Sequence, residues 1–282
     1  MNTVAYQSIE PCPELRPFIR RLIVARGDGF ENAVMRPIPT GYNYLLWVYD
    51  GELSISIDRR KSQMLRGLNF IGQWRKHDVI IKSRGRTSHV LAEFTGTGLY
   101  RLAHLSGATI HGRALEAERV APQVHTRLTD CLNTPLVDIQ SRPRALEDAL
   151  LACAEHSLPE IDYLEHTSRA IEAMDGRVRI SELSEEIGIS QRQLTRSFRN
   201  IVGLGPKFLS RVLQANTAFT ALVGGKAESL VALAQACGYY DQAHFIRAMQ
   251  DIFRYTPGAL SRNSPVELAE FLRGSRRFGK TG

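Results

Sequence analysis

The carboxy-terminal third of the chain contains one short pattern twice: a short helix, a glycine, a capping residue and a second helix. In the first copy Gly188 ends an apolar helix and Ser190 precedes the next one; Gly238 and Asp241 take these places in the second copy. Glycine adopts the positive φ that often ends a helix, and serine or aspartate accepts a hydrogen bond from an unpaired helix amide. The pattern therefore predicts two helix-turn-helix units.

The second helix of each copy has one apolar and one polar face, resolved at about 100° per residue. These helices begin at Gln191 and Gln242, which are 51 residues apart (242 minus 191). Arginine suits guanine, glutamine suits adenine, and small or apolar groups suit the thymine methyl. The predicted base-contacting residues are Gln191, Arg192, Thr195, Arg196, Gln242, Ala243, Ile246 and Arg247, and the predicted phosphate contacts are Arg199 and Lys207. For one such helix a merely solvated face is the better interpretation, but two copies favour major-groove recognition.

Charge is concentrated in the same region. The chain carries a formal charge of +7, and residues 188–264 contain nine basic and three acidic residues, an excess of six. Such a concentration would displace counterions from phosphates. The segment Pro206–Leu222 predicts a stiff helix of roughly 25 Å at 1.5 Å per residue. It would hold the two recognition helices near the ~34 Å repeat of one duplex turn.

Residues 161–262 resemble the DNA-binding domain of the AraC/XylS family of bacterial regulators. The residues that carry the resemblance are the run Leu183–Ser190 with Leu194, Arg196, Phe198 and Gly203, then the run Ala234–Arg247 and Tyr255-Thr256-Pro257. By position the resemblance implies base contacts at residues 192, 195, 196, 242, 243, 246 and 247. Met249, Gln250 and the segment Phe253–Tyr255 depart from the family's usual aromatic, basic and glycine residues.

The first hundred residues read as strands. Residues 44–49 and 53–57 flank Asp50-Gly51, which predicts a β-hairpin. Residues 69–72, 79–81 and 90–94 predict further strands, typical of a sandwich or small barrel. The segment 13–119 is similar to the cupin-like domains that precede such DNA-binding units. That similarity implies a sensing or dimerising role.

The predicted fold class is α+β: a β-rich cupin-like amino-terminal domain, a helical bridge and an all-α carboxy-terminal domain with two helix-turn-helix units. The predicted boundaries are 1–97 for the sensor domain, 98–158 for the bridge, 159–264 for the DNA-binding domain and 265–282 for a basic tail. The bridge either packs on its own sheet or contributes a dimer contact.

Candidate ligand-binding residues lie in the amino-terminal half. Arg36, Tyr42, Trp47 and Trp74 are the types that line a small-molecule pocket, although aromatic residues there are more often core. His77 and His89 stand alone, and the four cysteines form no CxxC pair, so neither a metal nor a cofactor is predicted. The sequence shows no catalytic motif.

We therefore predict a cytoplasmic transcription regulator, activator or repressor, that binds double-stranded operator DNA and is not an enzyme. RNA polymerase, an unknown small-molecule effector and a second copy are candidate partners, and no membrane partner is expected. Two alternatives stay open. One is a DNA-repair alkyl-transfer protein with a fused domain of this type, which would need a reactive cysteine such as Cys12. The other is a protein-interaction module whose arginines bind acidic partners.

Overall fold

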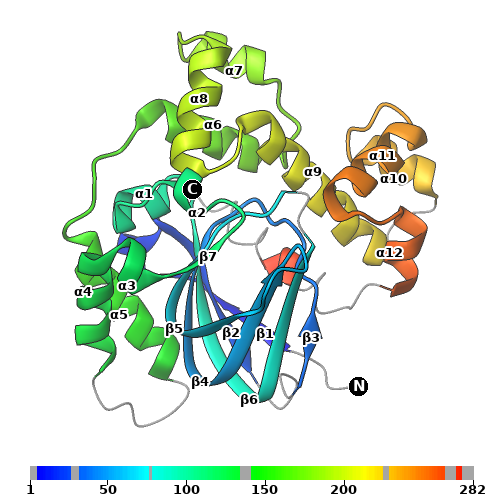
Figure 1. Ribbon diagram of the computed structural model, residues 1–282. Helices are drawn as coiled ribbons and strands as arrows, with labels where there is room; N and C mark the ends of the chain where they lie inside the picture. The colour runs from blue at the N-terminus through cyan, green and yellow to red at the C-terminus, as the bar shows by residue number, and fades with distance from the viewer. Residues whose placement is uncertain are drawn as a thin grey trace.

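The computed structural model describes residues 5–26, 32–75, 78–133, 141–224, 229–263 and 271–274. An antiparallel sheet formed by the amino-terminal part is followed by helices, so the α+β prediction is confirmed (Figure 1). The strands are β1 (Ala5–Ile9), β2 (Ile19–Arg26), β3 (Val34–Met35), β4 (Tyr44–Ile57), β5 (Gln63–Ile71), β6 (Val79–Phe94) and β7 (Ala114–Glu116). The sheet order is β1-β2-β6-β4-β5-β7, and β3 pairs with β6.

The predicted hairpin at Asp50-Gly51 is wrong. Strand β4 runs without interruption from Tyr44 to Ile57, and it pairs with β6 on both sides of the glycine. The register shifts at Asp50, and Gly51 has φ +77°, which marks a bulge rather than a turn. A Cβ at position 51 would lie 2.1 Å from the Arg86 carbonyl oxygen. A positive-φ glycine serves a bulge as well as a turn, and here the neighbouring strand decides.

The two faces of the sheet bury different residues. Leu45, Phe70 and Phe94 belong to the core that also includes helices of the bridge, whereas Tyr44 and Leu46 belong to a second core on the other face. This division follows from the alternation of side chains along a strand.

The predicted helical bridge contains short helices and one strand. Its elements are α1 (Gly98–Ala103), α2 (Gly107–Ile110), β7, α3 (Ala117–Val120), α4 (Pro122–Leu132) and α5 (Arg142–Ala154). Strand β7 was not predicted; it extends the sheet by pairing with β5. Helices α4 and α5 cover one face of the sheet (Figure 1), and Leu128 and Leu150 are fully buried there.

The carboxy-terminal helices include the predicted starts at Gln191 and Gln242, and the predicted segment Pro206–Leu222 differs from the observed helix by one residue. They are α6 (Asp162–Ala173), α7 (Ile180–Glu186), α8 (Gln191–Val202), α9 (Pro206–Val223), α10 (Leu230–Ala236), α11 (Gln242–Phe253) and α12 (Pro257–Asn263). In the described part of the chain, no helix is both long and apolar enough to cross a bilayer.

A buried ionic cluster joins the sheet to α6. Glu93 accepts hydrogen bonds from Arg20 Nη1 (2.6 Å), Arg21 Nη2 (2.9 Å) and Tyr44 Oη (2.9 Å). Arg20 Nε also donates to Glu172 Oε2 of α6 at 3.2 Å. Neither Arg21 nor Glu93 has exposed surface. Two arginines and two carboxylates thus balance one another away from water, as buried charges require.

The predicted basic tail contains a packed segment. Residues 271–274 form a helical turn at the sheet, and the remaining residues of 265–282 lie outside the described part. The Phe271 carbonyl oxygen accepts from Arg21 Nη1 at 2.8 Å, its ring meets Tyr6 edge-on at 5.2 Å, and Leu272 is 2% exposed. This segment reaches back from the end of the chain to its first strands. The sequence offered no local signal for that contact.

Burial of one histidine predicts acid sensitivity. His89 on β6 is buried, and burial lowers its pKa to about 4. An unfolded chain binds a proton on this side chain near pH 6.5, so the unfolded state gains protons first as the pH falls. We expect His89 to make its full contribution to the free energy of unfolding above about pH 6.5. That free energy should fall by about 3 kcal/mol between pH 6.5 and pH 4.

Urea unfolding at several pH values measures this dependence, and H89Q should flatten it. His104, which is exposed, supplies the matched control H104Q. An unchanged pH slope in H89Q would contradict the assignment.

Candidate nucleic-acid interface

The first helix-turn-helix unit consists of α7 and α8. Gly188 has φ +72°, and the Ser190 hydroxyl accepts a hydrogen bond from the Gln193 amide at 3.2 Å. These are the predicted turn and cap. On the inner face of α8, Leu194 and Phe198 have no exposed surface. The predicted base-contacting residues Gln191, Arg192 and Arg196 are exposed, and Thr195 is half-buried.

The second unit, α10 and α11, repeats this construction. Gly238 has φ +78°, and Asp241 Oδ1 accepts from the His244 amide at 2.6 Å. Phe245 is fully buried. Of the predicted base-contacting residues, Ala243 and Arg247 are exposed, and Gln242 and Ile246 are half-buried. Both second helices therefore keep an open polar face.

Helix α9 lies between the two units (Figure 1) and is hydrogen-bonded to the loop before the first unit and to the second unit itself. The Ser210 hydroxyl donates to the Gly176 carbonyl just before α7. Gln214 Nε2 donates to the carbonyls of Cys237 (2.9 Å) and Gly238 (3.2 Å) in the turn of the second unit. Arg211 pairs with Asp251 of α11 at 2.7 Å. These bonds attach α9 to the second unit, and Leu209 of α9 shares a buried apolar core with Phe198 of α8.

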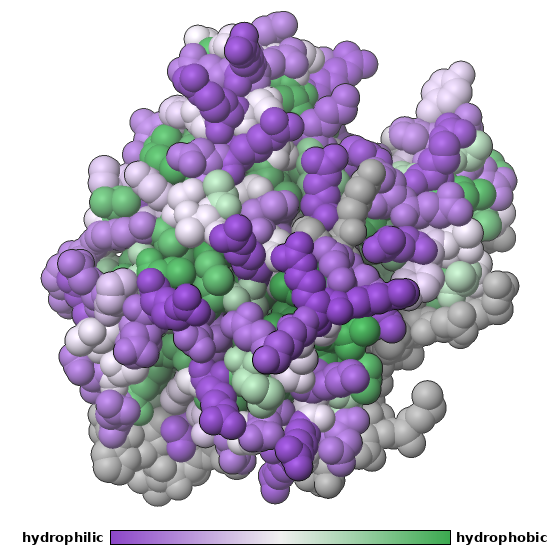
Figure 2. All heavy atoms as spheres, viewed as in Figure 1, coloured by the Kyte–Doolittle hydropathy of each residue, from purple (hydrophilic) through white to green (hydrophobic). Residues whose placement is uncertain are grey.

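The cations on the predicted DNA-binding surface share one feature: none has an ion-pair partner among the described residues. Within the described residues, no ion pair engages Arg192, Arg196, Arg199, Lys207 or Arg247. The first three of these lie on α8, Lys207 lies at the start of α9, and Arg247 lies on α11. Elsewhere in the domain two exposed arginines are paired, Arg169 with Glu160 at 3.0 Å and Arg179 with Glu182 at 2.9 Å. Hydrophilic residues cover the outer end of α7 and α8 in the space-filling view (Figure 2). Unpaired cations are available to an anionic partner without first breaking an internal bond.

One exposed aromatic residue was missed in the sequence. Tyr240, in the turn of the second unit, is 91% exposed, whereas its neighbour Tyr239 is 4% exposed and packs on Phe245. An aromatic side chain this exposed beside a recognition helix is available for a contact to the sugar-phosphate backbone. The pair of adjacent tyrosines was the available signal, because only one of them can point inward.

An arginine ends α11 at the place where the resembling family usually has a glycine. Arg254 occupies the C-cap of α11 in the left-handed conformation, with φ +65°. A residue with a Cβ adopts this conformation at a cost of about 1 kcal/mol relative to glycine. The helix therefore still ends where the turn before Thr256 requires it.

The four predicted ligand-binding residues do not converge. Tyr42 and Trp74 are buried in the core on one face of the sheet, and Trp47 is buried in the core on the other. Arg36 is exposed and pairs with Asp78 at 2.8 Å. Aromatic composition alone did not reveal on which face each residue lies.

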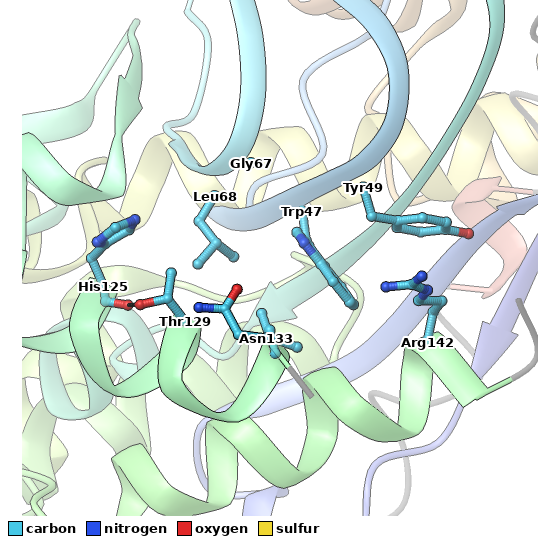
Figure 3. Close-up of a pocket in the computed structure, with 9 residues that line it drawn as sticks. Trp47, Tyr49, Gly67, Leu68, His125, Thr129, Asn133 and Arg142 are labelled. Carbon is cyan, nitrogen blue, oxygen red and sulfur yellow. Dashed lines mark hydrogen bonds between the residues drawn. The ribbon is translucent and has the colours of Figure 1, made fainter. Parts of the chain in front are cut away.

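Trp47 instead borders a pocket of about 290 Å³ between β4–β5 and helices α4 and α5 (Figure 3). The lining residues are Trp47, Tyr49, Gly67, Leu68, His125, Thr129, Leu132, Asn133 and Arg142. The Arg142 guanidinium lies over the rings of Trp47 and Tyr49, at 5.6 and 5.0 Å from their centroids, and its buried Nε has no hydrogen-bond partner among the described residues. None of the lining residues in the described part of the chain is acidic. At Asn133 the chain continues into residues 134–140, outside the described part.

The cysteines and the possible metal ligands bear on whether the chain has an enzymatic alternative, such as alkyl transfer. All four cysteines are free thiols. Burial raises the pKa of Cys12, and burial also raises the pKa of Cys153 to about 11. His77 lies outside the described residues. The residues that the structure describes contain no cluster of three or more histidine, cysteine or acidic groups that would hold a metal.

Comparison with known proteins matches residues 183–263 to a family described as a helix-turn-helix domain. Among solved structures, ToxT from Vibrio cholerae is 8% identical, with 96% of this chain and 98% of that chain covered and a TM-score of 0.45. ToxT bound to an unsaturated fatty acid is 10% identical, with 82% of this chain and 91% of that chain covered and a TM-score of 0.43. The AraC-like transcriptional activator CuxR is 14% identical, with 74% of this chain and 84% of that chain covered and a TM-score of 0.25. No curated protein sequence matches the chain.

Proposed function

We propose that this chain, whose residues 183–263 form a helix-turn-helix domain of the AraC type, reads two successive major grooves of one DNA duplex as a transcription regulator. One observation carries the proposal. Two capped helices, each with an open polar face and arginines that lack an ion pair in the described residues, flank one helix, α9, which packs on α8 and forms an ion pair with α11. A duplex repeats its major groove about every 34 Å, so a stiff connector favours binding on one side of the DNA.

The two recognition helices have different proposed roles. In α8, Arg192 and Arg196 read guanine through their planar guanidinium groups. In α11, Gln242 supplies an amide for adenine and Ile246 an apolar contact for a thymine methyl. Gln191, Thr195, Ala243 and Arg247 complete the two base-contacting surfaces.

Selection from a random pool of duplexes, followed by footprinting of the DNA upstream of the gene and its neighbours, tests the proposal. We expect a recovered sequence with two conserved blocks about 10 base pairs apart and protection on one side of the duplex. Recovery of a single block would contradict reading by both helices. If no sequence is enriched, base recognition itself is refuted.

The phosphate contacts make a separate prediction. Arg199 and Lys207 are exposed, and each is proposed to neutralise one phosphate. In R199A or K207A we expect binding to weaken about equally for selected and random duplexes, and the slope of log affinity against log salt to decrease by about 1. Titrations at several salt concentrations measure both quantities. A loss confined to the selected duplex would indicate base reading instead.

The alkyl-transfer alternative is less well supported than DNA reading. A nucleophilic cysteine needs a lowered pKa, whereas burial raises that of Cys12. Its amide is engaged with Glu147 Oε1 at 2.6 Å, a structural contact to α5. Covalent alkyl transfer from methylated DNA to Cys12, detected by mass spectrometry, would restore this alternative.

The interaction-module alternative invokes the same exposed arginines. An acidic protein partner would be bound through charge alone, so that selected and scrambled duplexes would compete with it equally. A preference for the selected duplex distinguishes the regulator from such a module.

A further inference from the structure

The carboxyl end of α8 is held by the amino-terminal domain and the bridge. The last four carbonyls of a helix have no partner within it. Two of these in α8 receive hydrogen bonds from distant residues. The Ser106 hydroxyl donates to the Asn200 carbonyl at 2.6 Å. Asn43 Nδ2 and Gln73 Nε2 both donate to the Val202 carbonyl, at 3.1 and 3.5 Å.

A backbone-to-backbone contact reinforces these bonds. A Cβ at Gly107, the first residue of α2, would lie 2.4 Å from the Val202 carbonyl carbon and 2.6 Å from the Gly203 nitrogen. Gly203 has φ +97° and approaches Gly107 from the other side. Two glycines therefore let α2 touch the end of α8 directly, and such a contact tolerates little displacement.

The two amides are buried despite an incomplete set of hydrogen bonds. Asn43 is 2% exposed and Gln73 is 4% exposed. Their oxygens, Oδ1 and Oε1, are buried without a partner in the described structure. Burying an amide is unfavourable unless it is hydrogen-bonded, so the bond to Val202 is the main compensation at each position.

Asn43 also belongs to the sheet. Its carbonyl accepts the Phe94 amide of β6, and it lies between Tyr42, which stacks under Arg20, and Tyr44, which donates to Glu93. The end of a recognition helix is thereby attached to the strands that carry the buried ionic cluster.

We propose that Asn43, Gln73 and Ser106 are positioning residues for DNA reading: they fix the orientation of α8 from outside the DNA-binding domain. The proposal rests on the proposed function, because it assigns a role in reading the half-site that α8 contacts. It makes the amino-terminal domain and the bridge part of the machinery that orients the first recognition helix.

Three buried asparagines supply matched variants. Asn43, Asn69 and Asn216 are 2%, 0% and 4% exposed, each donates Nδ2 to a backbone carbonyl, and each has a buried Oδ1 without a partner. Asn69 bonds to Arg66 within the sheet. Asn216 joins α9 to Thr40 and does not involve α8. Their alanine variants remove the same atoms from three different places.

The experiment uses the full chain and a duplex selected from a random pool by the unaltered protein. Affinity is measured for this duplex and for versions with base changes in either half-site. We expect N43A to bind about tenfold more weakly, which corresponds to about 1.4 kcal/mol. It should lose discrimination only in the half-site read by α8. N69A should keep the discrimination in that half-site, and N216A, on the helix between the two units, should not confine a loss to it.

Hydrogen exchange of the free protein gives a readout that needs no DNA. We expect the amides of α8 to exchange about tenfold faster in N43A than in N69A, because loss of an external bond permits local opening. Equal exchange in α8 for these two variants would overturn the proposal. Loss of discrimination in both half-sites to the same extent would overturn it as well.

Ser106 keeps the test decisive if N43A does not fold. S106A removes one half-buried hydroxyl, and S106T restores a donor at the same position. We expect faster exchange in α8 for S106A and recovery for S106T; no difference between them would count against positioning. If the unaltered protein enriches no sequence, the proposed function fails, but the exchange measurements still decide whether these residues hold α8.

Discussion

Replacing Arg192 or Arg196 by alanine is expected to reduce binding to the selected duplex by about 1–3 kcal/mol for each residue. Both side chains are exposed on the outer face of α8 and have no ion pair within the described structure. Their removal should therefore leave the fold intact. A bidentate arginine discriminates guanine from other bases, so the preference at one base position should relax in each variant.

Binding titrations with the selected duplex and a set of single-base variants measure this loss. R169A is the matched control, because Arg169 is an exposed arginine of the same domain that pairs with Glu160 at 3.0 Å. R169A should change the affinity for DNA less than about twofold, because Arg169 is not among the predicted DNA contacts. Loss of its surface ion pair should lower the stability of the fold by only about 0.5 kcal/mol. If R192A and R196A weaken binding to random DNA as much as to the selected duplex, these residues bind phosphate and do not read bases.

Replacing Glu93 by glutamine is expected to destabilise the protein by about 3–5 kcal/mol. Glu93 has no exposed surface and accepts from Arg20, Arg21 and Tyr44. The glutamine would leave two buried guanidinium groups with only one carboxylate, Glu172, nearby. Breaking one partner out of a buried ionic cluster is costly because the remaining charge stays away from water.

Urea unfolding at neutral pH measures this effect. E52Q is the control: Glu52 pairs with Arg66 at 3.1 Å on the surface, with the arginine side chain 72% exposed, so its loss should be within about 1 kcal/mol. A loss below about 1 kcal/mol in E93Q would show that Arg20 and Arg21 find other partners.

Local patterns predicted the candidate interface well. The caps at Ser190 and Asp241 and the turns at Gly188 and Gly238 are found as expected. Each of these depends on the conformation and hydrogen bonding of a few neighbouring residues. The apolar spacing likewise identified the inward faces, since a helix repeats every 3.6 residues in any environment.

Long-range pairing was less predictable. Asp50-Gly51 has the composition of a hairpin turn, but β6 pairs along the whole of β4 and makes it a bulge. Trp47 and Trp74 have the same chemical character, yet they are buried on opposite faces of the sheet. Residues 271–274 were expected in a tail and instead contact Arg21.

The amino-acid sequence by itself determined the two helix-turn-helix units, their outward arginines and the helical connector, because these follow from periodicity, capping and composition within short segments. Only the tertiary structure decided what holds them: the amides of Asn43 and Gln73 at the end of α8, and the ionic cluster around Glu93. The physical reason is distance along the chain. Asn43 and Val202 are 159 residues apart, and a hydrogen bond between them exists only after both domains have folded against each other.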